Sequence, residues 1–207
     1  MSNQNDPQPF LEGLKLLNAL GAELQAVIEL QKELEPNLAG RLMTRSLFSL
    51  LDAYSFFLKS RSLISHNCAQ TEFTQKELRF LNEGETVVQN GTEKWQPFLP
   101  GIKENLKSSI RLYSKVRGIG TPLGGSIPLP PEFDHALKLR TRVTHPKRLS
   151  DLEISKPDAA ALSAVVQWFM AMQVWTRDQE LAFIDQTRKN TNESISAQIE
   201  SLKKRGA

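Results

Sequence analysis

Apolar residues recur at intervals of three and four along most of this chain, and this spacing constrains the fold more than any other feature. The clearest run lies between residues 10 and 34, and Pro36 ends it because proline cannot continue a helix. No segment alternates apolar and polar residues long enough to predict a strand, and the single Asn90-Gly91 pair lacks strand-like flanks. The pattern therefore predicts helices packed on helices.

Capping residues, prolines and glycines divide the rest of the chain into further helices and two loop excursions. Apolar residues cover more than half the circumference of the second helix, which should be the most buried element. Pro146 must end the helix that Pro130 opens, and Ser155 and Asp158 should cap the helix that follows. The expected helices are 10–34, 38–66, a short one from the Thr74–Glu77 capping box to about 82, 102–116, 130–144 and 155–189.

These elements predict an all-α fold, a bundle of four to five main helices in a single domain over residues 10–190. The Gly- and Pro-containing ranges 83–101 and 118–131 are expected to be loop excursions. Residues 1–9 are expected to be disordered. Residues 191–207 are expected to form a polar C-terminal tail, either helical or loose.

Composition places the chain among soluble globular proteins and excludes several kinds of site. The net charge is only +3, which does not by itself imply nucleic-acid binding, and a single cysteine, Cys68, excludes an intramolecular disulfide. The N-terminus has neither the basic start nor the apolar stretch of a secretory signal, so we expect a cytoplasmic protein. Residues 159–176 carry no formal charge, but polar residues dilute them, and we interpret them as a bundle helix, with no membrane contact expected.

Metal and cofactor chemistry is not expected from these motifs. The sequence has no His-Glu-x-x-His, no Glu-x-x-His and no cysteine pair, so zinc and di-iron sites are excluded, and no cofactor is predicted. Cys68 lies two residues from His66, but nothing in the sequence activates the thiol. We interpret it as structural.

The segment from Lys138 to Arg148 is the most informative, with five Lys or Arg residues, one His and no acid. Winding the helix from Phe133 onward places Arg140 on one arc with the apolar residues Phe133, Ala136, Leu137, Leu139 and Val143. A guanidinium on a packing face requires a partner. Arg140 could pair with Asp52 of the second helix as a structural residue, or it could handle phosphate together with His145.

Arg140, followed by His145 after four intervening residues within a helical bundle, resembles the Arg-x(4–6)-His signature of the HEPN superfamily. The following long helix, with its aromatic pair Trp168-Phe169, is similar to the last core helix of that group. The resemblance covers the architecture of residues 38–190 and the specific residues of 138–169. Arg61 and His66 have the same spacing but lack the basic cluster.

The resemblance implies a homodimer whose two motifs meet across the interface and cut RNA without a metal, and it leaves room for a neutralising protein partner. His145 would act as general acid or base, and Arg140 would stabilise the negative charge that develops on phosphorus. Thr144 or Thr141 would position the Arg140 side chain, although ribonuclease members of the family often have Asn or Asp where Thr141 stands. The residues expected to bind RNA phosphates are Lys138, Arg142, Lys147 and Arg148.

A second interpretation remains open. The same bundle could be a non-catalytic helical interaction or regulatory module, in which Arg140 is a structural ion-pair residue.

Overall fold

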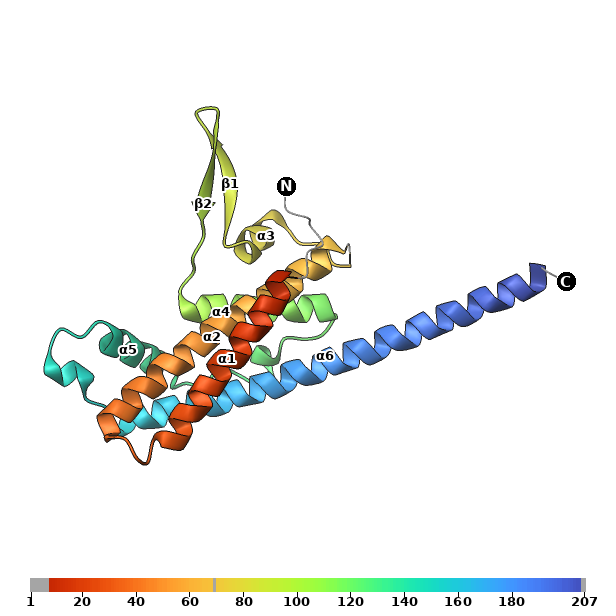
Figure 1. Ribbon diagram of the computed structural model, residues 1–207. Helices are drawn as coiled ribbons and strands as arrows, with labels where there is room; N and C mark the ends of the chain where they lie inside the picture. Colours follow the sequence, from red (N-terminus) through yellow and green to blue (C-terminus); the bar gives the residue numbers. More distant parts are fainter. Residues whose placement is uncertain (1–7, 69, 206–207) are drawn as a thin grey trace. The chain divides into compact units, whose positions relative to one another are not determined.

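A computed structural model describes residues 8–68 and 70–205 of the chain, and it is mainly helical (Figure 1). The chain divides into two compact units, residues 1–168 and 169–207, and the division falls inside the last helix. We describe each unit by itself. The elements in chain order are α1 (Gln8–Leu30), α2 (Pro36–Asn67), α3 (Gln75–Leu81), β1 (Gly84–Gln89), β2 (Thr92–Pro97), α4 (Ile102–Arg117), the 3₁₀ turn η1 (Pro122–Gly124), α5 (Phe133–Thr144), the 3₁₀ turn η2 (Leu149–Leu152) and α6 (Lys156–Arg205).

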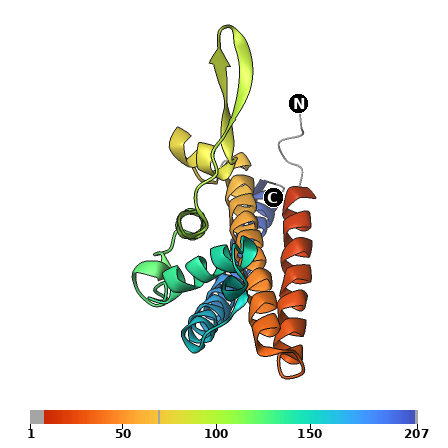
Figure 2. The same ribbon diagram turned by 90° about the vertical axis from the view of Figure 1, so that its left-hand side faces the viewer.

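Helix α2 is the centre of the first unit. It lies beside α1, which runs antiparallel to it, and it also packs against α4 and α5 (Figures 1 and 2). Apolar residues lie on most sides of α2, so its side chains are buried around most of the helix, as the sequence predicts. Its buried apolar side chains are Leu47, Phe48, Leu50, Leu51, Ala53, Tyr54, Phe57 and Leu58.

Three aromatic rings join α2, α5 and the first part of α6. The ring of Phe133 meets Phe48 edge to face at 6.3 Å and Trp168 at 6.1 Å. Trp168 also donates its indole N–H to the carbonyl of Ile127, at 3.4 Å. This contact fixes α5 against the core and determines which of its faces points to solvent.

Local signals set the helix ends as expected. Thr74 and Glu77 form the predicted capping box of α3, in which each side chain accepts from the other residue's backbone N–H. Gly118 ends α4 in the left-handed conformation, with φ of 65°. Helix α5 ends at Thr144, before Pro146, so the predicted stop is confirmed.

The sequence predicts no strand, and this prediction is wrong for residues 83–101. Strands β1 and β2 pair antiparallel from Gly84 opposite Pro97 to Gln89 opposite Thr92, and they form a hairpin that leaves the helices (Figures 1 and 2). Asn90 and Gly91 have φ of 53° and 75°, the conformation of a two-residue hairpin turn. In the other excursion, 118–131, the structure places the short turn η1.

A buried lysine fixes the base of this hairpin. Lys59 of α2 is only 2% exposed and donates to Glu83 at 3.0 Å. Its ammonium also lies 4.6 Å from the centre of the Phe80 ring. Because a buried charge needs a partner, this pair ties the start of β1 to α2.

Helix α6 extends beyond the predicted end near residue 189. It continues to Arg205, so residues 191–205 of the expected tail are helical, and residues 206–207 lie outside the described part. At the other end of the chain, Gln8 already begins α1, and the expected disorder of residues 1–7 lies outside the described residues as well. Side chains 184–199 are all exposed.

One helical stretch among the described residues, within Leu149–Ile199, is long and apolar enough to cross a membrane by length and composition alone. The 18-residue window concerned is 39% buried in the structure.

Candidate functional site

Helix α5 presents one face to the core and the opposite face to solvent. Its buried residues recur at three and four, which is the arc that the sequence predicts. They are Phe133, Ala136, Leu139 and Val143. The polar residues His135, Lys138 and Arg142 stand on another side at spacings of three and four, so they form a second stripe along the same helix.

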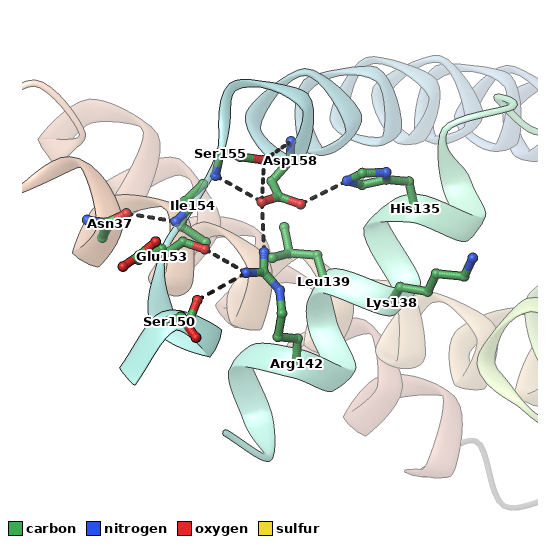
Figure 3. Close-up of a pocket in the computed structure, with 10 residues that line it drawn as sticks. All are labelled: Asn37, His135, Lys138, Leu139, Arg142, Ser150, Glu153, Ile154, Ser155 and Asp158. Atoms are coloured by element: carbon green, nitrogen blue, oxygen red, sulfur yellow. Dashed lines mark hydrogen bonds and ion pairs between the residues drawn. The ribbon is translucent and has the colours of Figure 1, made fainter. Parts of the chain in front are cut away.

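Asp158 at the start of α6 is the centre of a hydrogen-bond cluster (Figure 3). Its carboxylate accepts from Arg142 Nη2 at 2.7 Å and from His135 Nε2 at 2.8 Å. The other two donors belong to Ser155, whose backbone N–H and hydroxyl lie 2.9 and 2.7 Å away. The cluster therefore joins α5 to the N-terminus of α6, and Ser155 and Asp158 form the predicted cap.

The charge of Asp158 is strongly stabilised. Burial opposes its ionisation, but the hydrogen bonds from Ser155 and His135 and the charge of Arg142 outweigh that effect, and they lower the pKa of Asp158 to about 2. Asp158 is thus a carboxylate at neutral pH, and His135 donates its Nε2 proton to it.

Arg142 also holds the loop between α5 and α6. Its Nη1 donates to the carbonyl of Glu153 at 2.9 Å and lies 3.5 Å from that of Ser150. Arg41 of α2 donates to the carbonyl of Leu152, at 2.9 Å. Arginines thus satisfy carbonyls that a short loop leaves unpaired. Arg142 is the structural ion-pair residue of this region, the role that the second interpretation gives to Arg140.

An open hollow of about 730 Å³ surrounds the cluster. Lys138 lies at its rim, and Figure 3 shows its side chain extending away from Asp158. Asn37 of α2 closes the opposite side by accepting from the backbone N–H of Ile154 at 2.7 Å. Most polar groups of this hollow are already bonded to one another, which identifies the cluster as a fold-stabilising centre.

A second hollow of about 720 Å³ lies on the solvent face of α5 and contains most of the predicted site. Two acids and one leucine complete its lining: Asp134, Asp151 and Leu137. The predicted site residues that line it are Lys138, Thr141, Arg142, His145 and Lys147. We call these five residues the α5 basic face.

His145 stands at the C-terminal end of α5. Its backbone N–H donates to Thr141 at 3.1 Å, and its side chain is exposed. Among the described residues, no side chain orients the imidazole by a hydrogen bond.

Both threonines bond to their own helix. The Thr144 hydroxyl donates to the carbonyl of Arg140 at 2.7 Å, and the Thr141 hydroxyl donates to that of Leu137 at 3.2 Å. Neither hydroxyl bonds to a guanidinium in this structure.

Arg140 is half-buried and does not line the hollow that contains His145. Within the described residues its guanidinium forms no ion pair or hydrogen bond, and its charge acts on Asp52 of α2 at longer range. Burial raises the pKa of Asp52, while the charges of Arg140 and Lys59 oppose that rise. Within one chain, the two residues of the motif therefore belong to different faces of α5.

The loop after α5 is shaped by Asp151. Its carboxylate accepts the backbone N–H groups of Lys147 and Arg148, at 2.8 and 3.0 Å. These bonds lower the pKa of Asp151. The side chain of Arg148 is exposed and lies outside the lining of the hollow.

Sequence reasoning missed His135 and the joining of Asp158 to Arg142. The sequence did contain a signal for both. His135, Lys138 and Arg142 are spaced along one helix face, and the next helix has a carboxylate at its third position.

Arg61 and His66 are the second match to the Arg-x(4–6)-His spacing. The imidazole of His66 donates its Nδ1 proton to the carbonyl of Thr71 at 3.0 Å. His66 is thus occupied in a turn.

Among the described residues, no group of three or more His, Cys, Asp or Glu side chains is placed to hold a metal ion.

Comparisons with known protein families, with curated proteins and with solved structures give no match to this chain. Fold and site together define a mainly helical protein with a basic hollow on one exposed helix face.

Proposed function

We propose that this chain binds RNA through the α5 basic face. The observation that supports the proposal most strongly is the gathering of Lys138, His145 and Lys147 in one hollow, although they stand up to nine residues apart. Cationic side chains around a hollow on an exposed surface suit a phosphate backbone, which supplies most of the affinity in nucleic-acid binding.

The acids of the hollow cancel only part of this charge. Asp134 pairs with Lys103 of α4 at 2.7 Å, whereas Asp151 accepts two neutral backbone N–H groups and keeps its negative charge. Within the described part of the chain, Lys138 and Lys147 take part in no ion pair. Their ammonium groups are available to phosphate oxygens.

Cleavage is a narrower proposal. An RNA-cleaving site of the HEPN type requires Arg140 beside His145, and the two lie on different faces of α5 in one chain. Such a site would need Arg140 from a second copy. The exposed imidazole, without an orienting side chain among the described residues, favours non-catalytic binding, which agrees with the second interpretation of the sequence.

Charge reversal tests binding. We expect Lys138→Glu combined with Lys147→Glu to weaken binding of single-stranded RNA and to reduce the slope of log affinity against log salt by about 1.4, since each lost phosphate contact removes about 0.7 for a single strand. The matched control is Lys107→Glu combined with Arg111→Glu, which reverses two exposed charges on α4 outside the hollow. Equal losses in both variants would contradict a defined surface.

Complementation tests cleavage. Wild type, His145→Ala, Arg140→Ala and an equimolar mixture of the two variants are incubated with RNA in excess EDTA, and the ends are examined for 2′,3′-cyclic phosphate. A site shared between copies predicts no cleavage by either variant alone and partial recovery in the mixture. If wild type binds RNA without cutting it, the function is binding.

A further inference from the structure

Asp151 has one carboxylate oxygen without a hydrogen-bond partner in the hollow that contains the α5 basic face. Its Oδ2 accepts both backbone N–H groups, from Lys147 at 2.8 Å and from Arg148 at 3.0 Å. No donor among the described residues bonds to Oδ1. The other acid of the hollow differs, because both oxygens of Asp134 accept from Lys103, each at 2.7 Å. Asp151 therefore offers the hollow a free acceptor.

The carboxylate of Asp151 is also held in place and ionised. Two backbone bonds to one oxygen restrict the side chain before any ligand arrives, so little further freedom is lost on binding. The bond from the Lys147 N–H, together with that from Arg148, lowers the pKa of Asp151 from its ordinary value of 3.8. At neutral pH its Oδ1 can only accept a hydrogen bond.

The charge of Asp151 restricts what can lie beside it. Lys138 and Lys147 line the same hollow and attract phosphate oxygens, whereas an ionised carboxylate repels them. A strand in this hollow must therefore place a hydrogen-bond donor, and not a phosphate, against Asp151. The donor that RNA carries on every sugar, and that DNA lacks, is the ribose 2′-hydroxyl.

We propose that Asp151 Oδ1 accepts a hydrogen bond from a ribose 2′-hydroxyl and thereby makes the hollow prefer RNA to DNA. This inference rests on the proposed RNA binding by the α5 basic face, and it names the group of the substrate that the hollow distinguishes. Lys147 bonds to Asp151 through its backbone while it also lines the hollow. A phosphate at the Lys147 ammonium and a sugar at the carboxylate thus belong to neighbouring parts of one strand.

Two single-stranded oligonucleotides of one sequence, RNA and 2′-O-methyl RNA, test this contact. The methyl ether keeps the ribose oxygen and removes its donor hydrogen. We expect the wild type to bind RNA about 10-fold more tightly, because a hydrogen bond to a charged group contributes about the free energy of one factor of ten in affinity. DNA of the same sequence should bind more weakly than RNA as well.

Asp151→Asn should remove most of this preference. The amide has the size of the carboxylate, and its oxygen can still accept the two backbone N–H groups. Its NH₂ group then lies where Oδ1 was, and it donates equally well to the oxygen of a hydroxyl or of a methyl ether. The ratio of the two affinities is the measurement, because a fraction of unfolded protein lowers both affinities alike and leaves their ratio unchanged.

Asp134→Asn is the matched control. It removes the same charge from the same hollow, at an acid whose two oxygens are already bonded to Lys103. Both oligonucleotides should respond to it equally, so the preference for RNA over 2′-O-methyl RNA should stay that of the wild type.

Three results would overturn the contact with the 2′-hydroxyl. They are a ratio that Asp151→Asn leaves unchanged, an equal change of the ratio in the Asp134→Asn control, and an equal loss of affinity for both oligonucleotides in Asp151→Asn, which would assign the bond to an amino group of a base. If Lys138→Glu with Lys147→Glu leaves RNA binding intact, the proposed function fails and this contact with it. If that variant weakens binding while the ratio does not respond to Asp151→Asn, only the contact fails.

Discussion

At the scale of single residues, Asp158 connects charge to stability. Its pKa is about 2 in the folded chain and near 3.8 when unperturbed, so the folded state binds fewer protons between these values. The stabilisation is fully present above about pH 4 and is lost as pH falls through about 2. With a side chain that is 9% exposed, we expect it to amount to roughly 2 kcal/mol.

Asp158→Asn should therefore lower the free energy of unfolding by roughly 2 kcal/mol at pH 7. The difference from wild type should shrink as the pH is lowered toward 2, in urea titrations repeated across that range. Asp134→Asn is the control, because its side chain is 60% exposed and its ion pair with Lys103 contributes little. A pH-independent difference for the Asp158 variant would show that packing, and not charge, is lost.

The neighbouring arginines provide a second prediction. Arg142 donates to Asp158 and to a loop carbonyl, whereas Arg140 has no ion pair among the described residues. In thermal unfolding, Arg142→Ala should lower the free energy of unfolding by about 2 kcal/mol, and Arg140→Ala should lower it by less than about 1 kcal/mol. The reverse order would restore Arg140 as the structural residue.

How much of the site could be predicted depended on whether the relevant contact was local. The arc of α5 follows from helical geometry, so Phe133, Ala136, Leu139 and Val143 are buried as expected. A carboxylate that reaches α5 from the next helix depends on the intervening loop, which helical spacing does not encode. For that reason the sequence directed attention to Arg140 and not to Arg142.

At the scale of elements, the hairpin shows why a strand can escape a periodicity test. Alternation arises when one face of a strand is buried and the other is wet. Every residue of β2 is exposed, so its sequence contains no such alternation. The local turn signal at Asn90-Gly91 was correct, and the missing core face hid its meaning.

The turn and the base of the hairpin should respond differently to substitution. Gly91 has a φ of 75° and open space around it, so Gly91→Ala should cost about 1 kcal/mol through backbone strain alone. At Gly84, an added Cβ would lie 2.5 Å from the Trp95 ring and 2.6 Å from the backbone oxygen of Gln96. Gly84→Ala should therefore disrupt pairing, and amide hydrogen exchange of residues 84–97 should rise much more in this variant than in Gly91→Ala. Equal protection in both would contradict the close packing at Gly84.

At the scale of the whole molecule, the two units differ in what stabilises them. The first unit has a core built around α2, with buried side chains from α4, α5 and the start of α6. The second unit is a helix whose residues 184–199 are all exposed. Because helical stability comes mostly from packing, the exposed part of the second unit should be less stable than the core of the first.

Unfolding of the full chain should therefore occur in two steps. Far-ultraviolet circular dichroism should show a first loss of helical signal at low temperature, because residues 184–199 have no buried face to stabilise them. The near-ultraviolet signal of core aromatics such as Tyr54 and Phe133 should report a second transition at higher temperature. In the variant Gln186→Pro, which breaks the exposed helix, the first transition should fall to lower temperature and the second should remain. A single transition reported by both signals would show that the two units unfold together.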